Sequence, residues 1–222
     1  NTSSPKDWIK ALRLHQWMKN ILIFVPLLTA HQLTNISLVF QGLLAFAFFG
    51  LCASSVYLLN DLLDLNDDRH HKSKRYRPFA SGKLSIRAGL IVFPLLLGIA
   101  FIGSALLLPW EFTATLVAYY ILTLAYSLSM KRKMVVDVIS LAVLYTIRII
   151  AGACALGLDL TFWILAFSMF MFLSLALVKR YAELREAKHN GHTKKTRGRG
   201  YYPDDLEMIS SLGASSGYLA VM

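Results

Sequence analysis

Long apolar runs are the feature that most constrains how this chain can fold. Hydrophobic residues make up 56% of the 222 residues and charged residues only 16%, whereas a soluble domain has about 45–50% and about 25%. The excess lies in runs of membrane-spanning length, where each segment must satisfy its own backbone hydrogen bonds. The sequence therefore predicts an all-α fold, a polytopic transmembrane helix bundle.

We expect six apolar spans and the start of a seventh. The spans are 16–33, 38–61, 86–108, 112–130, 136–157 and 161–179, and the last begins near 206. Small residues inside the spans can let helices approach closely; they are Gly50, Ser54, Gly98, Gly103, Gly152 and Gly157. The chain starts at Asn1 rather than Met and ends in an apolar segment, so we expect residues 1–222 to be one transmembrane domain, truncated at its C-terminus.

Basic residues are confined to one set of connectors. Of the 23 Lys and Arg residues, all but Arg148 lie near the N-terminus or in and beside the segments 62–85, 131–135 and 180–205. Alternating spans bring these segments to one side, and the positive-inside rule makes that side cytoplasmic. Topology and attraction to anionic membrane lipid thus explain the net charge of +10 without a nucleic-acid partner. We expect a multi-pass protein of the cell membrane with a cytoplasmic N-terminus.

Carboxylates gather at the inner end of the second span. Asp61, Asp64 and Asp68 are spaced i, i+3 and i+7, which brings them to one face of a helix. Carboxylates stacked in this way repel one another unless a cation lies among them, and Mg²⁺ is held by a few carboxylates plus substrate phosphates. Asn60 is either a further ligand or a cap. The alternative is a solvated helix end.

A basic loop follows these carboxylates directly. Its candidate phosphate ligands are Lys72, Arg75 and Arg77, because guanidinium groups bind phosphate with two hydrogen bonds and Lys offers a point charge. Charge topology alone could explain half of the basic residues. The acidic face and the basic loop together suggest a metal-complexed diphosphate at the cytoplasmic membrane surface.

Further polar groups lie near the same membrane face. Tyr126 and Lys131 flank an inner-face turn before Asp137, which either caps the next helix or belongs to the site. Lys179 and Glu183 form either a local salt bridge or a second acidic face that shares the metal.

Two more candidates are cations. Arg148 is in mid-span, where charge is expensive and faces a cavity or a partner; it binds either phosphate or carboxylate, or forms a structural pair with an Asp. Arg13 and Lys19 belong to the basic entry segment, close to the same membrane face.

The pattern Asn60-Asp61-x-x-Asp64-x-x-x-Asp68 resembles the first aspartate motif of the UbiA superfamily of intramembrane prenyltransferases. The turn from Tyr126 to Lys131 and Lys179 ahead of an acidic residue also resemble that family. The resemblance implies a bundle of nine transmembrane helices, about seven of them present here, around a lipid-open cavity that binds Mg²⁺–diphosphate.

One departure indicates a branch of the family. A second Asp-x-x-x-Asp motif is replaced here by Glu183, with Ala187 four residues on. The stretch Lys179-Arg180-Tyr181-Ala182-Glu183-Leu184, together with Arg13-x-x-Gln16-Trp17-x-Lys19-Asn20 and Arg148-Ile-Ile-Ala-Gly152, resembles the decaprenyl-phosphate phosphoribosyltransferases. That resemblance implies transfer of 5-phosphoribose from phosphoribosyl diphosphate to a polyprenyl phosphate, with a product that feeds cell-wall biogenesis.

The resemblance also implies roles for the candidate residues. Mg²⁺ would be held by Asp61, Asp64 and Asp68 with Glu183, and the catalytic group is Asp61, Asp64, Lys131 and Glu183. The substrates would be bound by Arg13, Lys19, Asn60, Lys72, Arg75, Arg77, Tyr126, Arg148 and Lys179. Two alternatives stay open: transfer of a polyprenyl group from its diphosphate to an aromatic or other small acceptor, and a transporter or lipid-binding scaffold. The assembly state also stays open, with a homo-oligomer as one option.

Overall fold

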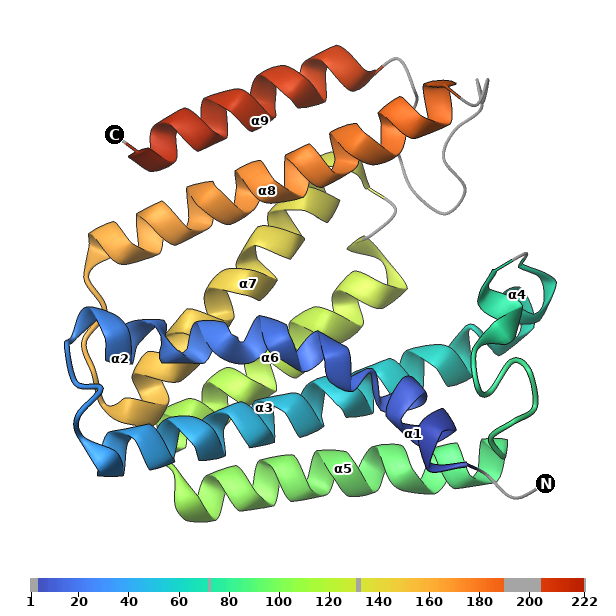
Figure 1. The fold of residues 1–222 in the computed structure, drawn as a ribbon, viewed down its shortest axis with the longest axis horizontal. Coiled ribbons are helices and arrows are strands. Elements are labelled where there is room, and N and C mark those ends of the chain that lie inside the picture. Colours follow the sequence, from blue (N-terminus) through green and yellow to red (C-terminus); the bar gives the residue numbers. More distant parts are fainter. Residues whose placement is uncertain (1–3, 72, 131–132, 190–204, 222) are drawn as a thin grey trace. The chain divides into compact units, whose positions relative to one another are not determined.

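The computed structural model describes residues 4–71, 73–130, 133–189 and 205–221. All regular secondary structure in these ranges is helical, as the sequence predicts (Figure 1). The α-helices are α1 (Pro5–Leu12), α2 (Val25–Thr29), α3 (Ile36–Leu63), α4 (Leu65–His70), α5 (Ile86–Leu107), α6 (Trp110–Leu128), α7 (Met134–Leu156), α8 (Phe162–His189) and α9 (Leu206–Val221). Two 3₁₀ helices are η1 (Leu14–Phe24) and η2 (Lys74–Tyr76).

Two compact units make up the chain. The first comprises Asn1–Tyr120 with Ile149–Leu158, and the second comprises Ile121–Arg148 with Asp159–Met222. The expectation of one transmembrane domain stays a prediction.

Five helices in the described residues are long and apolar enough to cross a membrane. They are Ile36–Leu63, Ile86–Leu107, Trp110–Leu128, Val135–Leu156 and Phe162–Glu186. Five of the six full spans expected from the sequence are therefore confirmed as candidate spans. Their outward faces carry large apolar side chains such as Ile91, Ile102 and Leu106, as lipid contact requires.

The span expected at 16–33 is wrong as a continuous α-helix. The chain there forms the 11-residue helix η1 and then the five-residue helix α2. Pro26 is at the start of α2, where it cannot donate a backbone hydrogen bond to the preceding turn. Polar Lys19 and buried Asn20 also interrupt the apolar surface of η1.

Small residues let η1 lie close against α3 and against the last turns of α7, both in the first unit. A Cβ on Gly50 of α3 would come within 2.6 Å of the Trp17 ring, and a Cβ on Gly152 would overlap the backbone carbonyl of Ile23. The Trp17 indole also donates a 2.9 Å hydrogen bond to Ser54 Oγ. The close-packing role expected for these glycines is therefore confirmed. It is wrong for Gly98 and Gly157, because no atom of the described residues lies within 4 Å of the Cβ position of either glycine.

A buried cluster joins α1, α3 and α5 near the inner end of α3. Its buried members are Ala11, Leu58, Phe79 and Leu84. Helices α3 and α5 run side by side (Figure 1), and Ser55 Oγ donates a 2.7 Å hydrogen bond to the carbonyl of Phe93. Phe79 anchors the loop between α4 and α5 in this cluster, and that loop carries the basic candidates.

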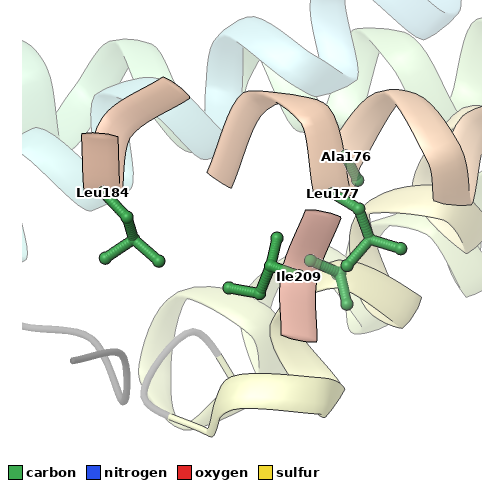
Figure 2. Close-up of a cluster of buried hydrophobic side chains, with 5 residues drawn as sticks. Ala176, Leu177, Leu184 and Ile209 are labelled. Carbon is green, nitrogen blue, oxygen red and sulfur yellow. The ribbon is translucent and has the colours of Figure 1, made fainter. Parts of the chain in front are cut away.

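In the second unit, α9 packs along α8. Figure 2 shows Ile209 of α9 next to Ala176 and Leu177 of α8. Leu184 extends the same cluster toward the end of α8, and Val138 of α7 belongs to it. The cluster fixes the stretch of α8 that carries Arg180 and Glu183.

Candidate functional site

The three aspartates do not lie on one continuous helix. Helix α3 ends at Leu63, Asp64 is its C-cap, and Asp68 belongs to α4. The backbone still follows a nearly helical path, because Asp64 N donates to Asn60 O at 2.9 Å and Asp68 N donates to Asp64 O at 2.8 Å. The structure therefore brings Asp61 and Asp68 together, and both are buried, with exposed fractions of 3% and 1%.

One guanidinium joins these two carboxylates. Arg77 Nη1 donates to Asp61 Oδ1 at 3.1 Å and to Asp68 Oδ2 at 2.7 Å. Phe79, two residues after Arg77, is buried in the cluster with Leu58 and Leu84. This anchor holds the loop where Arg77 can contact both carboxylates. Charge-assisted bonds of this kind are the stronger hydrogen bonds in proteins. The predicted proximity of the basic loop to the acidic residues is thus present for Arg77.

Arg13 reaches the same site from the N-terminal segment. Its Nη2 donates to Asp61 Oδ1 at 2.6 Å, and its guanidinium lies 4.9 Å from the centre of the Tyr57 ring. Arg13 has φ 51° and ψ 46°, a left-handed conformation that is uncommon outside glycine. This conformation ends α1 and starts η1, so the turn itself carries the arginine that contacts α3.

The Asp61–Asp68 pair has a donor set that suits a hard divalent cation. Asp68 Oδ1 is buried and accepts no hydrogen bond from the described residues; Lys74 Nζ lies 4.0 Å from it. A buried carboxylate oxygen without a hydrogen bond requires an explanation, and a metal ion would provide one. Mg²⁺ retains waters and binds substrate phosphates, so two carboxylates suffice to hold it.

The predicted metal ligands include two residues beyond the Asp61–Asp68 pair. The described residues contain no group of three or more His, Cys, Asp or Glu side chains placed to hold a metal. Asp64 is half-buried and lies at the break between α3 and α4. Its predicted metal contact, and that of Glu183, stay predictions.

The remaining candidates of the first unit have varied environments. Arg75 is exposed and bonds its neighbour, with Nη2 donating to Tyr76 OH at 2.7 Å. Lys19 and Asn60 are half-buried. Lys72 lies outside the described residues.

A second charged network is in the second unit. Arg180 donates to Asp137 from Nε at 2.5 Å and from Nη2 at 3.1 Å, and to Glu183 Oε2 from Nη1 at 2.6 Å. Tyr126 OH donates to Asp137 Oδ1 at 2.8 Å. Arg180 and Asp137 are buried at 2% and 0% exposure. Asp137 thus belongs to a network, and Tyr126 contacts it.

Arg180 was missed from the sequence. It follows Lys179 in a basic stretch, and of the two residues only Lys179 was predicted to bind substrate. Lys179 is the exposed member and Arg180 the buried one. The signal was the spacing of Arg180 to Glu183, i and i+3, with an Asp on the preceding span to receive the rest of the guanidinium.

Arg148 is buried, and its guanidinium contacts residues of its own helix. Its Nη1 donates to the carbonyl of Leu144, and its guanidinium lies 5.5 Å from the centre of the Tyr145 ring. Its predicted role in binding phosphate stays a prediction. Lys131 lies outside the described residues.

Comparison with known proteins gives relatives along nearly the whole chain. A family model described as the UbiA prenyltransferase family matches residues 21–193. An uncharacterized protein, y4nM of Sinorhizobium fredii, is 39% identical over 217 residues, which cover 98% of this chain and 42% of that protein. The nodulation protein NoeC of Azorhizobium caulinodans is 38% identical over 218 residues, 97% of this chain and 69% of that protein.

An enzyme and a solved structure are also similar. The decaprenyl-phosphate phosphoribosyltransferase of Mycobacterium tuberculosis is 32% identical over 212 residues, 94% of this chain and 70% of that protein. A UbiA homolog from Archaeoglobus fulgidus, solved with GPP and Mg²⁺, has a TM-score of 0.71 at 19% identity and covers 96% of this chain and 76% of its own. That likeness shows the fold.

The apolar helices and the family match agree on an integral membrane protein. Asp61, Asp64 and Asp68 lie within the matched stretch, at the end of α3 and in α4. The chain belongs to the UbiA prenyltransferase family.

Proposed function

We propose that the protein transfers 5-phosphoribose from phosphoribosyl diphosphate to a polyprenyl phosphate and releases diphosphate, in a reaction that depends on Mg²⁺. The observation that carries the proposal is the buried Asp61–Asp68 pair, with Arg77 and Arg13 beside it. The enzyme of Mycobacterium tuberculosis supports the choice of substrates, because 94% of this chain aligns with it. A product of this kind would serve cell-wall biogenesis.

Asp61 and Asp68, with Asp64 and Glu183 as further candidates, would hold Mg²⁺ together with the diphosphate. When bound there, Mg²⁺ supplies positive charge that stabilises the departing diphosphate. Arg77 and Arg13 already touch the carboxylates, so their remaining donors can bind phosphate oxygens. Lys72, Arg75 and Lys131 are further candidates for neutralising the diphosphate or the ribose 5-phosphate.

The acceptor requires charge neutralisation rather than a base. A phosphate monoester is anionic at neutral pH, so its oxygen can attack C1 of the ribose without prior proton removal. The bond from C1 to the diphosphate oxygen breaks as the new bond forms. Lys19, Asn60, Tyr126, Arg148 and Lys179 are proposed to orient the substrates, and the isoprenoid tail would lie in the lipid among the helices.

A second candidate is transfer of a polyprenyl group from its diphosphate to an aromatic or other small acceptor. The family description favours this reaction. The Asp61–Asp68 pair could hold the metal in either reaction, because both donors release diphosphate. The two reactions differ in which substrate is the lipid.

We also propose that the N-terminus and the site face the cytoplasm. The positive-inside rule supports this orientation, since the basic segments alternate with segments free of Lys and Arg.

The test supplies both substrate pairs to the natural protein, purified in detergent with Mg²⁺. One reaction contains phosphoribosyl diphosphate and a polyprenyl phosphate, and the other contains a polyprenyl diphosphate and 4-hydroxybenzoate. Mass spectrometry of the lipid product and release of diphosphate are the measurements. A lipid heavier by one phosphoribosyl unit is expected, whereas prenylated benzoate alone would replace the first proposal by the second.

A further inference from the structure

Four exposed cations of the first unit have no role in the site described above. Lys6 and Lys10 lie one turn apart on α1, whereas Lys83 precedes α5 and Arg87 is in its first turn. Their side chains form no ion pair within the part of the chain that the structure describes. These charges are therefore available to a ligand from outside the protein.

Apolar packing brings the four cations to one end of the first unit. Lys10 directly precedes Ala11, and Lys83 directly precedes Leu84. Both of these apolar residues are buried in the cluster that joins α1, α3 and α5. The Trp8 ring, between the two lysines of α1, packs against the same cluster. The cluster thus holds α1 next to the segment from which α5 starts.

Exposed apolar side chains lie among these cations. Ile9, between the two lysines of α1, is 53% exposed. Ile86 and Leu90, on the first turns of α5, are 40% and 53% exposed. Helix α5 is a candidate membrane span that begins at Ile86. The cations therefore lie where a span enters the bilayer, at the depth of the lipid headgroups.

The charge and the apolar groups together define the partner. Asp7 is the one acidic residue of α1 and is half-buried, and α5 contains no acidic residue. A leaflet of anionic phospholipid offers negative phosphates above an apolar layer, which matches a helix surface of lysines and exposed apolar side chains. A soluble anion would match the cations but would leave the apolar side chains in water.

We propose that α1 and the start of α5 form a surface that binds anionic phospholipid. Ile9 lies among the acyl chains, and the headgroup phosphates are bound by Lys6, Lys10, Lys83 and Arg87. A general attraction between basic connectors and the membrane would act at every connector, whereas this surface combines cations with exposed apolar side chains. The inference goes beyond the proposed function, because it involves neither substrate nor metal.

Lipid binding can be measured directly by native mass spectrometry of the protein released from detergent, which gives a dissociation constant for each probe. The probes are phosphatidylglycerol, phosphatidylcholine with the same acyl chains, and glycerol phosphate, which has the anionic headgroup without the chains. We expect phosphatidylglycerol to bind at least about tenfold more tightly than either of the other two.

Two double variants each remove half of the cations. One combines Lys6→Gln with Lys10→Gln on α1, and the other combines Lys83→Gln with Arg87→Gln beside α5. Each cation near a membrane surface contributes about fivefold in affinity for anionic lipid, so each double variant should weaken phosphatidylglycerol binding about 20-fold. Phosphatidylcholine binding should stay unchanged. Thermal unfolding shows which variants are folded, and either folded double variant decides the test.

The charge-matched control combines Lys133→Gln with Arg185→Gln, two exposed cations of the second unit. It should weaken phosphatidylglycerol binding by less than about twofold, since exposed charges beyond a Debye length are screened. An equal loss in the control would show a diffuse attraction of all basic connectors and would overturn the proposed surface. Equal affinity for the two phospholipids would overturn it too, and so would tight binding of glycerol phosphate. None of these outcomes bears on the transfer reaction, because the samples contain neither substrate nor Mg²⁺.

Discussion

Asp61 and Asp68, seven residues apart and on different helices, accept hydrogen bonds from the same nitrogen, Nη1 of Arg77. Both carboxylates are almost fully buried, and buried carboxylates persist only when their charge is compensated. Arg13 supplies the second guanidinium, at 2.6 Å from Asp61. At the inner end of α3, paired charges therefore add to the apolar cluster of Leu58 and Phe79 in holding the structure together.

Replacing Asp68 by Asn should remove most of the transferase activity. The change keeps the size of the side chain but removes the charge that the proposed metal needs. We expect kcat to fall by roughly 10²–10³-fold, the loss typical of a removed electrostatic contact to the departing group. The measurement is diphosphate release at saturating substrates. Asp67→Asn is the matched control, since Asp67 is exposed on the same helix; equal activity in both variants would exclude Asp68 as a metal ligand.

Replacing Arg77 by Gln should destabilise the protein, and a bound metal should restore part of the loss. Without the guanidinium, two buried carboxylates repel each other, which we expect to cost about 1–3 kcal/mol of unfolding free energy. Mg²⁺ with inorganic diphosphate binds only the folded state and should therefore raise the melting temperature. The expected rise is larger for Arg77→Gln than for the natural protein.

Thermal unfolding in detergent checks this prediction, with EDTA in one series and Mg²⁺–diphosphate in the other. Arg69→Gln removes an exposed arginine of α4 and serves as the control. A melting temperature of Arg77→Gln that equals that of the control in both series would show that the bridge contributes no stability.

Two glycine substitutions test the packing of η1. A Cβ at Gly152 would meet the backbone of Ile23, which cannot move aside as a flexible side chain can. We expect Gly152→Ala to destabilise the fold by about 1–3 kcal/mol. Gly98→Ala, at a helical position with nothing within 4 Å, should be neutral or should stabilise by about 1 kcal/mol through helix propensity. Denaturation midpoints of the two variants give the comparison, and equal midpoints would contradict the close approach.

The membrane helices could be predicted because hydropathy depends on local sequence alone. The spans at 38–61 and 86–108 correspond to α3 and α5 within a few residues. The prediction of one span at 16–33 failed because hydropathy does not detect residues that interrupt a helix. Pro26 and the left-handed turn at Arg13 divide that segment into short helices.

The acidic residues of the site and the nearby Arg77 could be predicted, but the pairings made by Arg13 and Arg180 could not. Helical spacing predicted that Asp61 and Asp68 lie on the same face. The two side chains remain close although α3 ends before Asp64, because helix-like backbone hydrogen bonds continue across the break. Arg13 and Arg180, by contrast, are 48 and 43 residues from the aspartates they bond. Such pairings depend on helix packing, which spacing along one helix does not reveal.

The most direct test of the account is calorimetric titration of inorganic diphosphate into the natural protein, with Mg²⁺ or with EDTA. We expect diphosphate to bind at least about tenfold more tightly with Mg²⁺ than with EDTA, and we expect this difference to be lost in Asp68→Asn. Equal affinity with Mg²⁺ and with EDTA, or an Asp68→Asn variant that keeps the full Mg²⁺ dependence, would contradict the claim that the Asp61–Asp68 pair holds a metal-complexed diphosphate.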